Sequence, residues 1–239
     1  MRLLIIRHAD PDYPNNTITA AGHLEAKALA KKLKHAGLTR LYASPLGRAL
    51  HTMQYTAEAT GLPHTVEEWT REMSIALEPT PETWGHGGKR LMAWDVPGEV
   101  IRNCTDLPTC ADWHTREFFS DPTFRHAYEE MVRHSDGFLA RHGYVREGNR
   151  YRIVEANREK IAVFCHGGFG LTWLAHLLAL PVTLVWSSFW LPPSSVTTVL
   201  FDERTSTWAV PRVIGMGDVG HLYEEGLPVQ PAGIKANYE

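Results

Sequence analysis

Two short apolar runs, residues 2–6 (RLLII) and 161–165 (IAVFC), place the strongest constraint on how this chain can fold. A nearly continuous apolar run of this length is typical of a β-strand that is buried on both faces. Further short strands, over residues 41–43 and 64–67, alternate with segments of helical spacing. The sequence therefore predicts an α/β fold, a three-layer α/β/α sandwich with a mostly parallel central sheet.

Local signals indicate where the helices begin and end. Ser44 is placed to cap a helix that has Pro45 in its first turn and Gly61 beyond its last turn. Thr19 is placed in the same way before an earlier helix. The remaining expected elements are helices over residues 20–36, 123–142 and 169–179, a hairpin over 144–154, and strands over 196–201 and 207–214.

Residues 79–122 differ in composition from the rest of the chain. They contain five prolines, several glycines and the tryptophans Trp84, Trp94 and Trp113. This composition predicts an irregular insertion with short helices, whose tryptophans form local core or part of a lid. Because 239 residues suit one α/β domain with an insertion, we expect a single domain over residues 1–239, with residues 79–122 as a cap-like segment.

Charge and cysteine content exclude several classes of protein. A net charge of −3 provides no basic surface for nucleic acid. Cys104, Cys110 and Cys165 are odd in number and form no C-x-x-C pair, which favours a reducing compartment and hence a cytoplasmic location. The apolar stretch 171–193 is interrupted by Pro181 and polar residues, so we expect two buried elements there and no association with a membrane.

Two motifs that could suggest a metal or cofactor are rejected. The chain has 13 histidines but no H-E-x-x-H, and Arg7 beside His8 would repel a cation, so no metal site is expected. Residues 215–220 fit G-x-G-x-x-G, but too little chain follows for a dinucleotide-binding unit. We therefore expect no cofactor.

Positively charged and imidazole side chains follow three of the predicted strands. Arg7 and His8 follow the first strand, Arg48 lies in the first turn after the second, and His166 follows the strand over 161–165. Ligands of open α/β sheets bind outside the carboxyl ends of the strands, so these four side chains are expected to meet at one edge. Arginine forks match phosphate oxygens, and Gly167 allows the backbone to approach a ligand. The pattern predicts a site for a small-molecule phosphate ester.

At these residues the sequence resembles the histidine phosphatase superfamily, which includes the cofactor-dependent phosphoglycerate mutases. The R-H-G signature of the family is similar to Arg7-His8-Ala9, and the order and spacing of the motifs fit from residue 2 to about 214. The other similar segments are residues 18–26 (ITAAGHLEA), 44–52 (SPLGRALHT) and 163–168 (VFCHGG).

The resemblance implies a role for each residue of the pattern. His8 would be the nucleophile that carries the phosphoryl group as phosphohistidine. Arg7, Arg48, His166 and the backbone at Gly167 would bind the phosphoryl oxygens. His8 must be neutral to attack, and the two arginines are expected to lower its pKa.

A carboxyl group is also implied, to protonate the departing oxygen and then to activate water. In relatives this acid follows the third strand, where Glu72 is the best match in this chain and Glu78 is the alternative. Asn16 is a weak candidate for a further phosphate contact. The sequence favours a phosphatase acting on a phosphate monoester. A mutase that moves phosphate between hydroxyls and a non-catalytic phosphate-binding module remain as alternatives, and the oligomeric state is not predicted.

Overall fold

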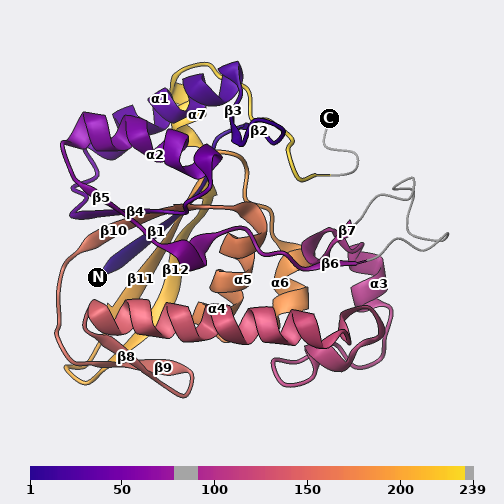
Figure 1. Ribbon diagram of the computed structural model, residues 1–239. Helices are drawn as coiled ribbons and strands as arrows, with labels where there is room; N and C mark the ends of the chain where they lie inside the picture. The colour runs from indigo at the N-terminus through magenta and orange to yellow at the C-terminus, as the bar shows by residue number, and fades with distance from the viewer. Residues whose placement is uncertain (78–90, 235–239) are drawn as a thin grey trace.

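The computed structural model describes residues 1–77 and 91–234. A sheet of eight strands lies between two layers of helices, in the order β5-β4-β10-β1-β11-β12-β9-β8 (Figure 1). The predicted three-layer α/β fold is therefore confirmed. The strands of this sheet are β1 (Arg2–Arg7), β4 (Arg40–Ala43), β5 (His64–Val66), β8 (Tyr144–Glu147), β9 (Arg150–Ile153), β10 (Lys160–Cys165), β11 (Val196–Glu203) and β12 (Trp208–Asp218).

The helices cover both faces of the sheet. Leu4 and Ile6 of β1 pack toward one helical layer, while Leu3 and Ile5 pack toward the other, which explains the continuous apolar run in the sequence. The first layer holds α1 (Ala20–Lys34) and α2 (Gly47–Thr60), with α7 (Gly220–Glu224) beside α1; the second holds α4 (Pro122–Arg141), α5 (Gly167–Leu178) and α6 (Val182–Ser188) (Figure 1).

The prediction of a mostly parallel sheet is only partly correct. β5, β4, β10 and β1 are joined by three parallel pairings, but β1, β11, β12, β9 and β8 are joined by four antiparallel ones. For two of these pairings the physical reason is the length of the connection. β8–β9 and β11–β12 are joined by turns, and a tight turn reverses the chain between antiparallel neighbours.

The two predicted helix caps have different outcomes. The Thr19 side chain accepts a hydrogen bond from the Gly22 backbone N–H and caps α1, as predicted. The prediction that Ser44 caps α2 is wrong, because α2 begins at Gly47 and Leu46 occupies the cap position. The Ser44 hydroxyl instead contacts His166. Gly61 ends α2 in the left-handed conformation, with a φ of 71°, as predicted.

The described part of the insertion packs at one end of α4 and beside α6 (Figure 1). Trp113 and Phe119 are buried there, with ring centroids 6.1 and 5.9 Å from that of Trp186. Residues 78–90, including Glu78 and Trp84, lie outside the described residues. The small elements are β2 (Pro11–Asp12), β3 (Thr17–Ile18), β6 (Ala76–Leu77), β7 (Leu91–Met92), α3 (Gly98–Arg102) and the 3-10 turns η1 (Glu68–Thr70), η2 (Ala93–Asp95), η3 (Trp113–Thr115) and η4 (Glu117–Phe119).

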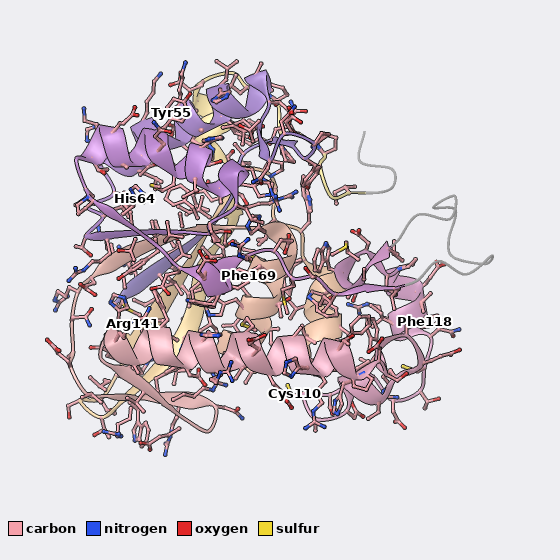
Figure 2. The ribbon with its side chains drawn as sticks, viewed as in Figure 1. Tyr55, His64, Cys110, Phe118, Arg141 and Phe169 are labelled. Carbon is pink, nitrogen blue, oxygen red and sulfur yellow. The ribbon has the colours of Figure 1, made fainter. Side chains whose placement is uncertain are left out.

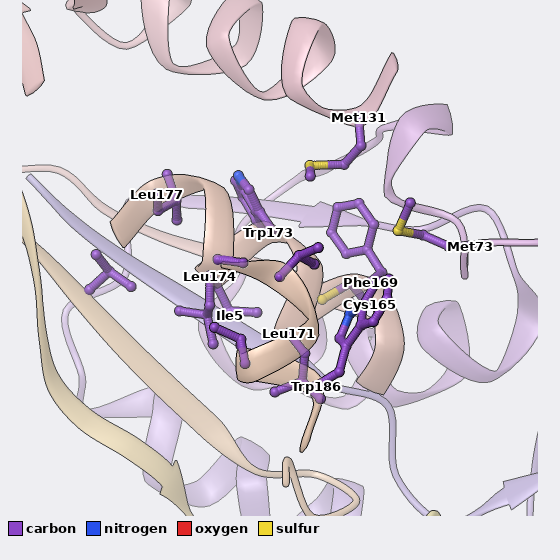
Figure 3. Packing of buried hydrophobic residues seen from close by; sticks show 14 of the residues in the cluster. Ile5, Met73, Met131, Cys165, Phe169, Leu171, Trp173, Leu174, Leu177 and Trp186 are labelled. Atoms are coloured by element: carbon purple, nitrogen blue, oxygen red, sulfur yellow. The ribbon is translucent and has the colours of Figure 1, made fainter. Parts of the chain in front are cut away.

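The second helical layer has a core of large side chains around α5. Figure 3 shows Phe169, Leu171 and Trp173 of α5 together with Met73 and Trp186, all of them buried. Among the described residues, no helix combines the length and the apolar character needed to cross a membrane.

Candidate active site

The carboxyl ends of β1, β10 and β4 form one edge of the sheet, which we call the rim. Arg7 pairs with Cys165 across β1 and β10, and Phe164 pairs with Ala43 across β10 and β4. The residues that follow these strand ends are His8, His166 and Ser44. Because parallel strands lie about 4.8 Å apart, the two imidazoles must be neighbours. Their ring centroids are 5.2 Å apart.

The imidazole of His8 is fixed in one tautomer. Its side chain is buried, and Nδ1 lies 2.8 Å from the carbonyl oxygen of Ala9. A carbonyl oxygen can only accept, so Nδ1 donates the proton and Nε2 carries the free lone pair when the ring is neutral. Burial, and then the positive charge of Arg7, hold the pKa of His8 well below its usual value. His8 is therefore neutral at physiological pH, with the free lone pair on Nε2.

His166 is paired with Ser44. Ser44 Oγ lies 2.8 Å from His166 Nε2 and accepts a hydrogen bond from the Leu46 N–H at 3.3 Å. The serine hydroxyl has a second lone pair, so it donates to Nε2 or accepts from it according to the tautomer of His166. Nδ1 of His166 is buried without a partner among the described residues. Burial, His8 and the two arginines lower the pKa of His166 well below its usual value.

The two arginines of the pattern lie at the same rim. Nη1 of Arg7 donates to the carbonyl oxygens of Leu191 and, at 2.9 Å, Ala232. Nη1 of Arg48 donates to Oδ1 of Asn16 at 3.3 Å, so Asn16 contacts an arginine of the site. The Nε atoms of both arginines are buried, and within residues 1–77 and 91–234 neither has a hydrogen-bond partner.

Glu72 lies at the first turn of α5. Its carboxylate accepts hydrogen bonds from the backbone N–H groups of Phe169 at 2.7 Å, Gly168 at 3.2 Å and Met73 at 3.1 Å. These three donors favour the ionised form, but burial has the larger effect and raises the pKa of Glu72. β5 and η1 thus bring Glu72 to the rim. Glu72 is the carboxyl group that the sequence favours over Glu78.

A cavity of about 710 Å³ opens at the rim. Arg7, Arg48, Glu72 and Gly167 all line it, so the structure brings these four predicted residues together. His8 and His166 are only 1% and 0% exposed and do not line it directly. Within the described chain, no three or more His, Cys, Asp or Glu side chains are grouped as metal ligands would be.

Sequence reasoning missed three contributors to the site. The Tyr13 ring lies 5.4 Å from Cζ of Arg48 and 6.5 Å from the His8 ring, in the loop where the sequence offers only Asn16 as a candidate contact. The Ser44 hydroxyl was assigned to a helix cap. Trp94, from the insertion, packs so closely on Gly168 that a Cβ atom there would lie 2.4 Å from the indole. In the sequence, the pair Gly167-Gly168 after His166 is the one signal that a large side chain approaches the backbone there.

The chain is similar in sequence to a known phosphatase and to a probable mutase. Residues 3–79 match the model of the histidine phosphatase superfamily (branch 1). The adenosylcobalamin/alpha-ribazole phosphatase of Salmonella typhi is 23% identical over 195 residues, which are 78% of this chain and 84% of that one. A probable phosphoglycerate mutase of Yersinia enterocolitica is 23% identical over 139 residues, 45% of this chain and 65% of that one.

The fold is also found among solved structures. The phosphoserine phosphatase of Entamoeba histolytica, solved in complex with 3-phosphoglyceric acid, superimposes with a TM-score of 0.59 at 19% identity and covers 92% of this chain and 98% of its own. The match of residues 3–79 and the fold shared over most of the chain confirm the resemblance to the histidine phosphatase superfamily that the motifs predict.

Proposed function

We propose that the protein is a phosphomonoesterase that works through a phosphohistidine at Nε2 of His8. The observation that carries the proposal is a set of three buried polar nitrogens at the rim that have no hydrogen-bond partner in residues 1–77 and 91–234: Nε of Arg7, Nε of Arg48 and Nδ1 of His166. An unpaired buried donor is unfavourable, and with the ring proton of His166 on Nδ1 the oxygens of a phosphate would satisfy all three. The names of the relatives, two phosphatases and a probable mutase, support the same class of chemistry.

In the first step, Nε2 of His8 attacks phosphorus and the bond from phosphorus to the ester oxygen breaks. The tautomer fixed by the Ala9 carbonyl presents the lone pair for this attack. Arg7, Arg48 and His166 stabilise the charge that spreads over the phosphoryl oxygens. Glu72, whose pKa is raised by burial, gives its proton to the departing alcohol.

In the second step, water attacks the phosphohistidine. The Glu72 carboxylate takes a proton from this water, inorganic phosphate leaves, and His8 and the protonated Glu72 are regenerated. Because His8 is almost fully buried, phosphate must displace part of the rim to reach Nε2. The Tyr13 side chain beside Arg48 is 59% exposed and is one part of the rim that contacts solvent.

The test is hydrolysis of para-nitrophenyl phosphate by wild type and by His8→Ala. We expect activity to fall by at least about a thousandfold in His8→Ala, because the nucleophile is lost. The matched control is His64→Ala, since His64 is exposed on the edge strand β5, away from the rim (Figure 2). Acid-labile phosphate on the wild type that persists in His8→Ala would refute the proposal.

The mutase alternative is tested separately. Wild type is incubated with 3-phosphoglycerate, and the products are followed for 2-phosphoglycerate and for inorganic phosphate. A phosphatase releases phosphate and forms no isomer. Isomer formation faster than phosphate release would replace the hydrolase with the mutase.

A further inference from the structure

We infer that Glu25 is a positioning residue for His8 and acts through the Ala9–Asp10 peptide. By holding this peptide, Glu25 keeps the ring proton of His8 on Nδ1 and leaves Nε2 free for attack. The inference rests on the proposed function, whose two steps do not use Glu25. Glu25 lies in α1, within the motif over residues 18–26, and its side chain is buried. It can therefore act on the site only through its neighbours.

The Ala9–Asp10 peptide lies between Glu25 and the imidazole of His8. Its carbonyl oxygen is 2.8 Å from Nδ1 of His8, and its N–H donates to Oε2 of Glu25 at 2.9 Å. The C=O and the N–H of a planar trans peptide point in opposite directions. A hydrogen bond that fixes the N–H therefore also fixes the carbonyl oxygen that sets the tautomer of His8.

The preceding peptide, His8–Ala9, is held by other groups. Its N–H donates to Oγ1 of Thr52 at 3.0 Å, and its carbonyl oxygen accepts from the Ser194 N–H at 3.1 Å. Neither of these bonds involves Glu25. Loss of the Glu25 acceptor would therefore release the peptide that contacts the imidazole ring and leave the preceding one in place.

The Glu25 side chain is itself held from behind. The Ser194 hydroxyl is hydrogen bonded to the Glu25 carboxylate and lies 3.0 Å from Nε2 of His221, and all three side chains are buried. Ser194 also has a φ of 55°, a left-handed conformation that is unfavourable for a residue with a Cβ. Buried polar groups and a strained backbone are typical of a functional site, and here they meet directly behind the nucleophile.

The experiment compares Glu25→Met with Glu25→Gln in the hydrolysis of para-nitrophenyl phosphate. Methionine is close to glutamate in size but offers the Asp10 N–H no oxygen acceptor, whereas glutamine does. We expect kcat/KM of Glu25→Met to fall by a factor of about 10², with the inhibition constant of inorganic phosphate within a factor of about three of wild type, because the nucleophile is misplaced and the phosphate-binding arginines are not. Glu25→Gln should recover most of the loss. The matched control is Glu129→Met, since Glu129 is exposed on α4.

Nitrogen-15 NMR of the imidazole rings gives a second measurement, which needs no turnover. The signals of His8 are those that disappear in His8→Ala. In wild type and in Glu25→Gln we expect one protonated and one unprotonated ring nitrogen, with well separated signals. In Glu25→Met the two signals should move toward each other as the tautomers exchange. If Glu25→Met does not fold, Glu25→Asp, whose carboxylate is drawn back by one methylene, is assessed by the same two measurements.

Two results would overturn the inference: a folded Glu25→Met with the kcat/KM of wild type, or unchanged His8 signals in that variant. Hydrolysis that depends on His8 would still stand in either case. Hydrolysis that is independent of His8 would overturn the proposed function, whereas the NMR comparison would still decide whether Glu25 positions the imidazole.

Discussion

Replacement of Glu25 by glutamine should stabilise the protein in a pH-dependent manner. Glu25 lies on α1 behind the loop that follows His8, is 2% exposed, and accepts a hydrogen bond from the Asp10 N–H at 2.9 Å through Oε2. Burial raises the pKa of Glu25 from 4.5 to about 7, although the Asp10 N–H acts in the opposite direction.

The magnitude follows from proton linkage. Below pH 4.5 the folded and unfolded chains both hold the proton of Glu25, so the group has no effect on stability. Between pH 4.5 and 7 the unfolded chain has released the proton and the folded chain has not, so stability falls as pH rises. Above pH 7 both are ionised, and the penalty of the buried carboxylate reaches about 3 kcal/mol. Glutamine keeps the acceptor for Asp10 and removes the charge.

Urea denaturation at pH 5 and pH 8 measures this difference. We expect Glu25→Gln to exceed wild type by less than about 1 kcal/mol at pH 5 and by about 3 kcal/mol at pH 8. The control is Glu224→Gln, because Glu224 is exposed on α7. An advantage of Glu25→Gln that is the same at both pH values would show that burial does not raise the pKa of Glu25.

Three further predictions concern the rim. Glu72→Gln should slow hydrolysis of alkyl phosphates by a factor of about 10² to 10⁴. With para-nitrophenyl phosphate, whose leaving group needs no proton, the same variant should give a burst of p-nitrophenol. Equal losses of activity on both substrates would contradict the acid role of Glu72. Because the pKa of His8 is lowered, a pH–rate profile should show kcat/KM level as pH falls through 6.5 and declining only below pH 6.5. A decline centred above pH 6.5 would contradict the lowered pKa of His8. Gly168→Ala should lower stability by about 1–3 kcal/mol in urea denaturation, because the new Cβ would lie 2.4 Å from the Trp94 ring; unchanged stability would show that Trp94 moves freely.

The sequence was sufficient for the part of the fold that places the candidate site. Apolar runs that end in Arg7-His8 and His166 already specify two parallel strands and the edge where they meet, and the register confirms it. The antiparallel half of the sheet could be predicted in part, because the sequence indicates a turn between the two late strands. A strand pattern carries no direction of its own, so the short connections should have outweighed the general α/β expectation.

The contacts of Ser44 and Trp94 could not be predicted from the sequence. A serine before a proline has the local preference of a helix cap, but the Ser44 hydroxyl is taken by a side chain more than a hundred residues away. Trp94 belongs to a segment without periodicity, so no local pattern could indicate that it packs on Gly168. Both residues were placed by long-range contacts, which override local propensity.

The antiparallel pairing of β11 with β1 has a consequence for the protein during its synthesis. Because β11 starts where β1 ends, the chain after residue 190 returns to the first motif: Leu191 accepts from Arg7, and the Ser194 N–H donates to the His8 carbonyl at 3.1 Å. A nascent chain that has only its early motifs outside the ribosome therefore has an incomplete candidate site. Under the proposed function, activity arises only near the end of translation, and fragments that stop before residue 190 should be inactive even where they keep all the motifs.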